Sequence, residues 1–371
     1  MLWFLIACAV PAFLVSFGAT ALMKRIAPRV GLIDQPAGVK AHSTHTKVTP
    51  LGGGLGIYLG FLLPVIAAQV AASLVATQPE LLNWLPDGFA AHLAGVATRS
   101  RTMWAIIVGG TVFVIMGLMD DLTSLPWLPR LLVQFLVAGA LVSADVRATV
   151  FVNQPWVGIA LTVLWIVLLT NSLNFLDNMD GLSAGIGLIA SVLFAIVMLI
   201  LVSEPRWLVG GALVVLAGSL AGFLCHNWHP ASIFMGDSGS MFIGLMLASL
   251  TVLGTFYDAE MTSPHVMLAP LCVLAVPLYD LTTVILIRLS QGHSPFHPDK
   301  NHFSHRLVAL GLSRKHAVQT VHLTTLTTGL GALLLYRLPG WPGAWLVIAL
   351  VICVLAIITI LEKAGRRKNG D

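Results

Sequence analysis

Long apolar stretches alternate with short polar segments along the whole chain. A helix that crosses a bilayer needs about 20 mainly apolar residues, and charges, prolines and glycines bound eleven such stretches here. The pattern therefore predicts an all-α, polytopic integral membrane protein with about eleven transmembrane helices and a single transmembrane domain, 1–371. The stretches run over 2–23, 52–76, 104–119, 130–148, 155–172, 183–202, 207–225, 239–256, 266–287, 317–336 and 343–361, and the third is short.

Composition supports this prediction and excludes other classes. The 371 residues are 57% hydrophobic and 10% charged, whereas a soluble domain is about a quarter charged. So few charges exclude a soluble globular enzyme. The net charge of +4 would suit nucleic acid, but the basic residues form no continuous stripe, so we expect no nucleic-acid partner. The four cysteines include no CxxC pair and indicate neither a disulfide framework nor a zinc finger.

Basic residues divide unevenly between the two predicted sides of the membrane. If the odd-numbered loops share one side, that side holds fifteen of the 20 Lys and Arg residues and the other holds five. Cytoplasmic loops are enriched in Lys and Arg, so the richer side is predicted to be cytoplasmic. The N-terminus is then outside and the C-terminus is cytoplasmic.

Carboxylate, amide and imidazole groups follow four of the predicted helices, always on that cytoplasmic side. They are Asp120 and Asp121 after the third helix, Asn171, Asn174, Asp177, Asn178 and Asp180 after the fifth, Asn227, His229 and Asp237 after the seventh, and His297, Asp299, His302 and His305 after the ninth. A structural protein has no need for such groups at the inner ends of four helices, so we predict one site. Its cytoplasmic loops lie near 24–51, 120–130, 171–182, 226–239 and 288–316.

Each cluster also has a structural interpretation. Asp120 and Asp121 suit a solvated helix end, and Asp237 suits the N-cap of the eighth helix. The glycines that flank Asp237 would also let the backbone approach a ligand closely. Asp280, inside the ninth predicted helix, is either functional or paired with Arg288.

The chemistry of this set indicates a metal and a phosphate. Several acids facing one compartment repel a nucleotide diphosphate unless a divalent cation lies between them, and Mg²⁺ binds one or two carboxylates together with substrate phosphates. Lys40, Lys300 and Arg306 suit an anionic nucleotide. His302 and His305 lack a third zinc ligand, so we expect them to donate hydrogen bonds to phosphate. Transfer of a phosphosugar from a soluble nucleotide to a polyprenyl phosphate in the bilayer meets these demands.

Two other classes use polar groups in membranes. A transporter or flippase places them near the bilayer midplane, with internal repeats, whereas here they lie at the inner edge. An intramembrane zinc hydrolase needs a general-base Glu beside its histidines, and neither Glu260 nor Glu362 lies near them in the sequence. Both classes are therefore disfavoured.

Five motifs, in order, resemble those of the polyprenyl-phosphate N-acetylhexosamine-1-phosphate transferases, glycosyltransferase family 4. Any one alone would be a weak signal, but together they cover roughly residues 30–315 and are specific. The motifs are Asp34-Gln-Pro36 through Lys40-Ala-His42 to Gly52-Gly53-Gly54, the pair Asp120-Asp121, the run Asn171 to Gly181, the segment Asn227 through Pro230 to Ser240, and the segment Pro295 through His302 to Leu307.

The resemblance implies a Mg²⁺-dependent enzyme, with Mn²⁺ as the alternative ion, in the bacterial inner membrane and with its active site facing the cytoplasm. Such an enzyme transfers N-acetylhexosamine 1-phosphate from a UDP-sugar to undecaprenyl phosphate and releases UMP. The eleven predicted helices and the Ser294-Pro-Phe296 segment resemble the UDP-GlcNAc branch, which begins lipopolysaccharide and other cell-envelope polysaccharides. The alternatives are phospho-MurNAc-pentapeptide transfer or another UDP-N-acetylhexosamine. A homodimer is left open.

The same resemblance assigns roles to residues. It implies metal binding by Asp237 with Asp120, catalytic roles for Asp120, Asp121, Asp177 and Asp180, and substrate binding by Lys40, Asn171, Asn174, Asn227, His302, His305 and Arg306. Asp120 would deprotonate the lipid phosphate. The chain departs from the family at Ser304, where a histidine is common. Direct attack by the lipid phosphate and a covalent intermediate on Asp177 or Asp180 both remain open.

Overall fold

The computed structural model describes residues 1–34, 48–78, 80, 100–148, 154–254, 264–297 and 299–368, with side chains to residue 362. Over these residues the chain is almost entirely helical, and its only strands, β1 (Ile33–Asp34) and β2 (Thr49–Pro50), pair antiparallel. The long helices are α1 (Leu2–Ile26), α2 (Gly53–Thr77), α4 (Ser100–Thr123), α5 (Trp127–Ser143), α6 (Pro155–Leu176), α7 (Leu182–Ile196), α8 (Trp207–Asn227), α9 (Asp237–Gly254), α11 (Ala275–Ser290), α13 (Arg314–Leu335) and α14 (Gly340–Lys368). The all-α membrane fold is confirmed.

Short elements complete the described chain. They are the 3-10 helices η1 (Ala27–Val30) and η4 (Pro264–Leu268), the π-helical turn η3 (Val197–Leu201) that continues α7, and the helices α10 (Ala269–Val273) and α12 (Phe303–Ala309). Each of the eleven predicted stretches contains one long helix. The third is longer than expected, because α4 extends to Ser100 at one end and past Asp120 at the other. Helix α12 was not predicted.

Nine helices in the described ranges are long and apolar enough to span a bilayer. A tenth candidate is the pair Pro264–Val273 and Ala275–Ser290, which is bent by 64°. Pro277 has no N–H for the carbonyl of Val273, where α10 ends, and this missing hydrogen bond accounts for the break. Helix α5, with 17 residues, falls just short. The number of spans and the side that each terminus faces remain predictions.

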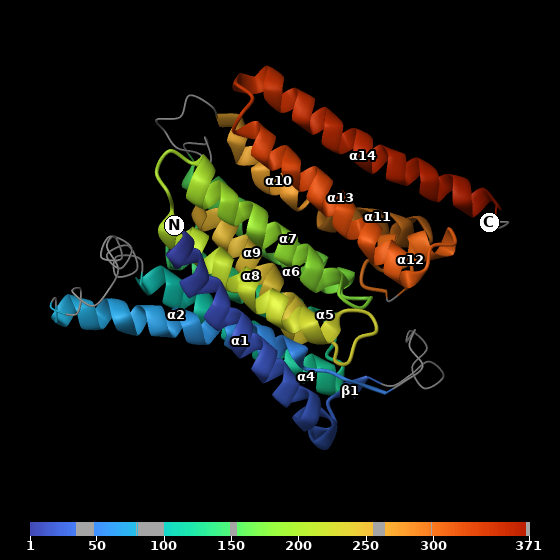
Figure 1. Ribbon diagram of the computed structural model, residues 1–371. Helices are drawn as coiled ribbons and strands as arrows, with labels where there is room; N and C mark the ends of the chain where they lie inside the picture. Colours follow the sequence, from blue (N-terminus) through green and yellow to red (C-terminus); the bar gives the residue numbers. More distant parts are fainter. Residues whose placement is uncertain are drawn as a thin grey trace.

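Helices α8 and α9 form the centre of the bundle, where 83% of each apolar window is buried. Only 11% of the corresponding windows of α1 and α14 is buried, so these helices present apolar faces to lipid. Figure 1 shows the N-terminus at one end of the bundle and the C-terminus of α14 at the other, beside α12.

Glycines let two helices approach the start of α9. A Cβ on Gly54 of α2 would lie 2.2 Å from the backbone N of Gly239, and one on Gly117 of α4 would lie 2.2 Å from the backbone N of Ser238. Both distances are far below van der Waals contact, so only glycine fits. This packing fixes the first residue of α9, Asp237, against α2 and α4.

Candidate functional site

One cavity, of about 460 Å³, lies at the end of the bundle where the odd-numbered loops meet. The four polar clusters found in the sequence all contribute to it. Its titratable lining residues are Asp34, Asp120, Asp121, Asp177, Asp180, His229, Asp237, Asp299, Lys300, His302, His305, Arg314 and Lys315. The predicted clusters therefore lie together around one cavity.

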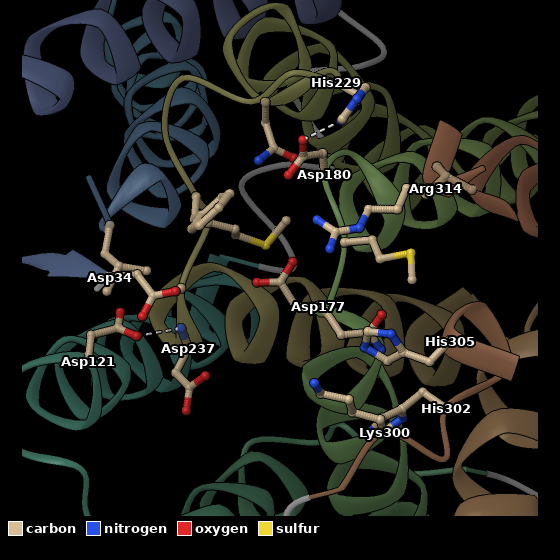
Figure 2. A pocket seen from close by; sticks show the side chains of 18 of the residues that line it. Asp34, Asp121, Asp177, Asp180, His229, Asp237, Lys300, His302, His305 and Arg314 are labelled. Carbon is tan, nitrogen blue, oxygen red and sulfur yellow. Dashed lines mark hydrogen bonds and ion pairs between the residues drawn. The ribbon is translucent and has the colours of Figure 1, made fainter. Parts of the chain in front are cut away.

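Charges are segregated across the cavity. We call Asp34, Asp120, Asp121 and Asp237 the acidic wall, and Lys300, His302, His305, Arg314 and Lys315 the basic wall. Figure 2 shows Asp34, Asp121 and Asp237 on one side, Lys300, His302, His305 and Arg314 on the other, and Asp177 between them. Such an arrangement can hold a cation at one side of a ligand and an anionic group at the other.

Three neighbouring helices hold Asp237. Its backbone N–H donates to Asp121 Oδ1 of α4 at 3.0 Å. Its Oδ1 accepts from Asn174 Nδ2 of α6 at 3.0 Å, and its Oδ2 accepts from Arg130 Nη1 of α5 at 3.0 Å. The carboxylate is therefore fixed in orientation while it lines the cavity.

Arg130 joins Asp237 to Asp120. The same Nη1 atom donates to Asp120 Oδ2, and the backbone N–H of Leu125 donates to Asp120 Oδ1 at 2.6 Å. A guanidinium between two carboxylates offsets their mutual repulsion. Arg130 was not among the predicted site residues, although it stands only ten positions after Asp120, on the side predicted to be cytoplasmic.

The glycines around Asp237 serve contacts within the protein. Gly236 has φ +74°, and a Cβ on it would lie 2.4 Å from Asp121 Oδ2. Gly239 packs against Gly54 of α2. They make room for the Asp121 carboxylate and for a neighbouring helix, and because Gly236 also lines the cavity, close approach of a ligand to its backbone remains a prediction.

Asp177 and Asp180 follow the end of α6. Burial, together with repulsion from Asp121 and Asp180, raises the pKa of Asp177 to about 8. Without a nearby cation this carboxyl group is therefore mostly protonated at pH 7. Asp180 Oδ2 lies 2.7 Å from His229 Nδ1 and accepts the backbone N–H of Ala231 at 3.0 Å, so it ties the 177–180 turn to the loop after α8.

Asn227 joins the same two loops. Its Oδ1 accepts the backbone N–H of Gly181 at 2.9 Å, and its Nδ2 donates to the backbone carbonyl of Ile233 at 2.9 Å. Asn227 lines the cavity but is only 5% exposed. Its amide groups shape the loops around the cavity.

The basic wall is positioned by a buried carboxylate. Asp280 of α11 is 0% exposed, its Oδ2 lies 2.9 Å from His302 Nδ1, and its Oδ1 accepts the backbone N–H of Phe303 at 2.5 Å. Because Nδ1 of His302 contacts Asp280, the other ring nitrogen, Nε2, is the one left for a ligand. The alternative pairing of Asp280 with Arg288 is wrong.

Arg288 is paired with Asp299 instead. Its Nε and Nη2 atoms donate to the two oxygens of Asp299 at 3.0 and 3.1 Å, and its Nη1 donates to the backbone carbonyl of Pro295 at 2.5 Å. Burial alone would raise the pKa of Asp299, but the hydrogen bonds from Arg288 and Asn301 outweigh it and hold the pKa at about 2. This pair of a buried Arg288 and a partly exposed Asp299 fixes the segment that carries Lys300.

His305 differs electrostatically from the lysine and arginines around it. Burial, followed by the positive charges of His302, Lys300 and Arg314, lowers the pKa of His305 to about 4. The imidazole is therefore neutral at pH 7. It acts there as a hydrogen-bonding group and does not add a charge to the basic wall.

Several predicted residues do not line the cavity. Asn171 donates to Gln134 Oε1 at 2.6 Å and so joins α5 to α6 inside the bundle. Arg306 is paired with Glu362 of α14 at 3.0 Å. Direct substrate contact by Asn171 and Arg306 thus has no support in this geometry, and Asn174 reaches the site only through Asp237. Lys40 lies outside the described residues.

Ser304, the departure from the family motif, is also away from the cavity. It is 0% exposed and donates from Oγ to Asn178 Oδ1 at 2.6 Å. Asn178 lines the cavity. Ser304 therefore does not contact the cavity itself but holds the side chain of Asn178, which does.

The acidic wall fits a divalent cation that is shared with a substrate. Within the ranges that the structure describes, no three His, Cys, Asp or Glu side chains converge as a complete metal-binding set. Mg²⁺ does not require one, because it usually binds one or two carboxylates together with phosphate oxygens and water. The four carboxylates of the acidic wall line one side of the cavity and Arg130 bridges two of them, so a bound cation would offset the repulsion that remains.

The sequence also left out Arg314 and Lys315 of the basic wall. They begin α13, just before the predicted start of the tenth apolar stretch. Their place in a basic loop on the predicted cytoplasmic side was the one available signal. Nothing in the sequence indicated that they lie opposite Asp237.

Comparison with known proteins gives consistent matches. Residues 103–255 match the family model for glycosyl transferase family 4. A probable undecaprenyl-phosphate N-acetylglucosaminyl 1-phosphate transferase of Bacillus subtilis is 32% identical, with 92% of this chain and 87% of the relative covered. A decaprenyl-phosphate N-acetylglucosaminephosphotransferase of Mycobacterium leprae is 33% identical over 96% of this chain and 90% of the relative. An undecaprenyl-phosphate alpha-N-acetylglucosaminyl 1-phosphate transferase of Salmonella typhi is 26% identical over 86% and 82%.

Proposed function

Because the chain belongs to the polyprenyl-phosphate N-acetylhexosamine-1-phosphate transferases of glycosyltransferase family 4, we propose that it transfers N-acetylglucosamine 1-phosphate from UDP-GlcNAc to undecaprenyl phosphate. The reaction forms a bond between the lipid phosphate and the β-phosphorus of the donor and releases UMP. We place the active site at the cytoplasmic face of the bacterial inner membrane. There the enzyme begins the assembly of a cell-envelope polysaccharide.

The segregation of charge across the cavity is the observation that carries this proposal. A nucleoside diphosphate sugar has two adjacent anionic phosphates, and the basic wall supplies Lys300, Arg314 and Lys315 to bind them. His302 adds a hydrogen-bonding nitrogen that Asp280 orients. The acidic wall lies across the cavity and requires a cation before a diphosphate can approach it.

Asp237 and Asp120 are the residues that would hold Mg²⁺, or Mn²⁺ in its place. The cation, when bound, neutralises the charge that accumulates on the leaving phosphate. Asn174 and the backbone contact with Asp121 hold the Asp237 carboxylate in position. Arg130 keeps Asp120 and Asp237 together.

Direct attack by the lipid phosphate is the mechanism we favour. Asp120, at the end of α4, would accept a proton from the acceptor phosphate, and the basic wall would orient the donor for in-line displacement. A covalent intermediate on Asp177 or Asp180 would use the same residues. UMP release from UDP-GlcNAc in the absence of acceptor lipid would support the covalent route, and strict dependence on the acceptor would support direct attack.

The donor specificity has a direct test. Purified protein should release UMP from UDP-GlcNAc when undecaprenyl phosphate and Mg²⁺ are present, and EDTA should abolish the release. A panel that contains UDP-GlcNAc, UDP-GalNAc and UDP-MurNAc-pentapeptide should show the highest kcat/KM for UDP-GlcNAc. Faster turnover of another donor would overturn the proposed substrate, and full activity in EDTA would overturn the proposed metal.

A further inference from the structure

The lipid-facing helix α14 reaches the active-site region through one buried ion pair. Arg306 Nε of α12 lies 3.0 Å from Glu362 Oε1 near the end of α14, and the two side chains are only 5% and 9% exposed. Figure 1 shows this end of α14 beside α12. The rest of α14 is mostly exposed to lipid, so a buried charge at this one point calls for an explanation.

Arg306 connects three parts of the chain. Its Nη2 donates to Thr283 Oγ1 of α11 at 3.1 Å, and its Nη1 donates to the backbone carbonyl of Asn301. Glu362 in turn accepts, at Oε2, the hydroxyl of Tyr279 at 3.1 Å. The guanidinium therefore links α14 and α11 to the residue that stands between Lys300 and His302.

The linked segment carries much of the basic wall. Lys300 precedes Asn301, His302 follows it, and His305 lies one turn further along α12. Helix α12 has only seven residues and depends on tertiary contacts for its position. Besides its packing on α13, two buried carboxylates supply such contacts, Asp280 at its N-terminal end and Glu362 through Arg306.

We propose that Glu362 is a positioning residue for the sugar-nucleotide site, acting through Arg306 on the segment 300–305. The inference rests on the proposed function. Without the Glu362 charge, Arg306 is an unpaired cation in a buried place, and it must move towards water or a new partner. Its hydrogen bond to Asn301 ties any such movement to Lys300 and His302. Donor binding should therefore weaken, whereas binding of the lipid acceptor should not.

The test measures steady-state UMP release by the full-length enzyme. Glu362→Gln should raise the KM for UDP-GlcNAc at least tenfold and change kcat less than threefold, with an unchanged KM for undecaprenyl phosphate. Arg306→Glu alone should be at least as damaging. The double variant Arg306→Glu with Glu362→Arg restores an ion pair and should return the KM to within threefold of the wild type.

Thr359→Val is the matched control. Thr359 lies one turn before Glu362 and contacts the Tyr279 hydroxyl at 3.0 Å, so its loss removes a polar contact of α14 but leaves the ion pair. It should leave the KM unchanged. A Glu362→Gln enzyme that has a normal KM but a smaller fraction of active protein would show a merely structural role and overturn the proposal. A charge-swapped enzyme that folds without recovering its KM would also overturn it.

Hydrogen exchange of the wild-type protein gives a second readout, which does not require any variant to fold. UDP-GlcNAc with Mg²⁺ should slow amide exchange both in 299–309 and near the end of α14, in 355–362. Protection of the first segment without the second would overturn the coupling. A wild-type enzyme that makes no UMP would refute the proposed function itself, and the two failures are thereby distinguishable.

Discussion

Replacing Asp237 with Asn separates catalysis from stability. The variant keeps the size of the side chain and leaves an oxygen to accept from Asn174, but it removes the negative charge. Asp237 is the predicted metal ligand on the acidic wall. The backbone N–H that donates to Asp121 is unaffected.

The structure sets the size of the two effects. The lost ion pair joins Asp237 Oδ2 to Arg130 Nη1 at 3.0 Å, with side chains that are 30% and 27% exposed. Ion pairs at this exposure contribute about 0–1 kcal/mol, so Tm should fall by no more than roughly 4 °C. Arg130 also keeps its contact with Asp120. Loss of one preorganised electrostatic group from a reaction centre typically lowers kcat by about 10²–10³.

The assay compares UMP release and thermal unfolding of purified wild-type and Asp237→Asn proteins in the same detergent. Asp145→Asn is the matched control, because Asp145 is exposed in the loop after α5, at the other end of the bundle, and Asn tolerates its φ of +67°. The control should keep wild-type activity. Turnover of Asp237→Asn above about a tenth of the wild-type rate would refute the assigned role, and a large fall in Tm would show that the residue serves folding.

Three further outcomes follow from the site. Asp299→Asn leaves Arg288, with a side chain 3% exposed, without its bidentate partner and should cost about 3–5 kcal/mol of stability, seen as a large fall in Tm. The folded-state pKa of His305, about 4, is below the unfolded value, so the unfolded chain binds more protons between about pH 4 and 6.5. Stability should therefore rise with pH across that window, and His305→Gln should flatten the rise in Tm measured against pH. Lys300→Gln should raise the KM for UDP-GlcNAc about tenfold and leave Tm nearly unchanged, because Lys300 is exposed; an unchanged KM would remove it from the donor site.

The helices could be predicted because the signal for a membrane helix is local. Each apolar stretch is long enough to specify its own helix, and the protein contains a helix for each. Helix α12 was missed for the opposite reason. It has seven residues, and contacts from Asp280 and Glu362, distant in the sequence, hold it in place.

The sequence indicates which kinds of residue gather at the site, but it does not show which side chains contact each other. The sequence places acids and histidines at one end of the bundle, yet it does not show which face of a helix meets which neighbour. Asp280 illustrates this, because Arg288 stands eight residues further along the same helix, a rise of about 12 Å that two side chains do not readily bridge. The carboxylate contacts His302, 22 positions away.

Two arginines show that the sequence does not reveal these pairings. The sequence assigns Arg306 to the site and leaves Arg130 out, and the structure shows the reverse. Arg306 was assigned to substrate from its motif, but it faces away from the cavity towards Glu362. From the sequence, Arg130 is only one of the basic residues of the predicted cytoplasmic side, whereas in the structure it joins two acids of the site. Both results depend on which helices pack against each other. The sequence pattern places the ends of these helices on one predicted side of the membrane, but it does not show which helices are neighbours.

The fate of the β-phosphorus tests the central claim most directly. UDP-GlcNAc labelled with ³²P at the β-position should be incubated with purified enzyme, undecaprenyl phosphate and Mg²⁺, and the lipid and aqueous phases should then be separated. Transfer of a phosphosugar requires the label to enter the lipid fraction in a one-to-one ratio with unlabelled UMP in the aqueous phase. Label that remains in water as UDP, with or without sugar in the lipid, would contradict the account.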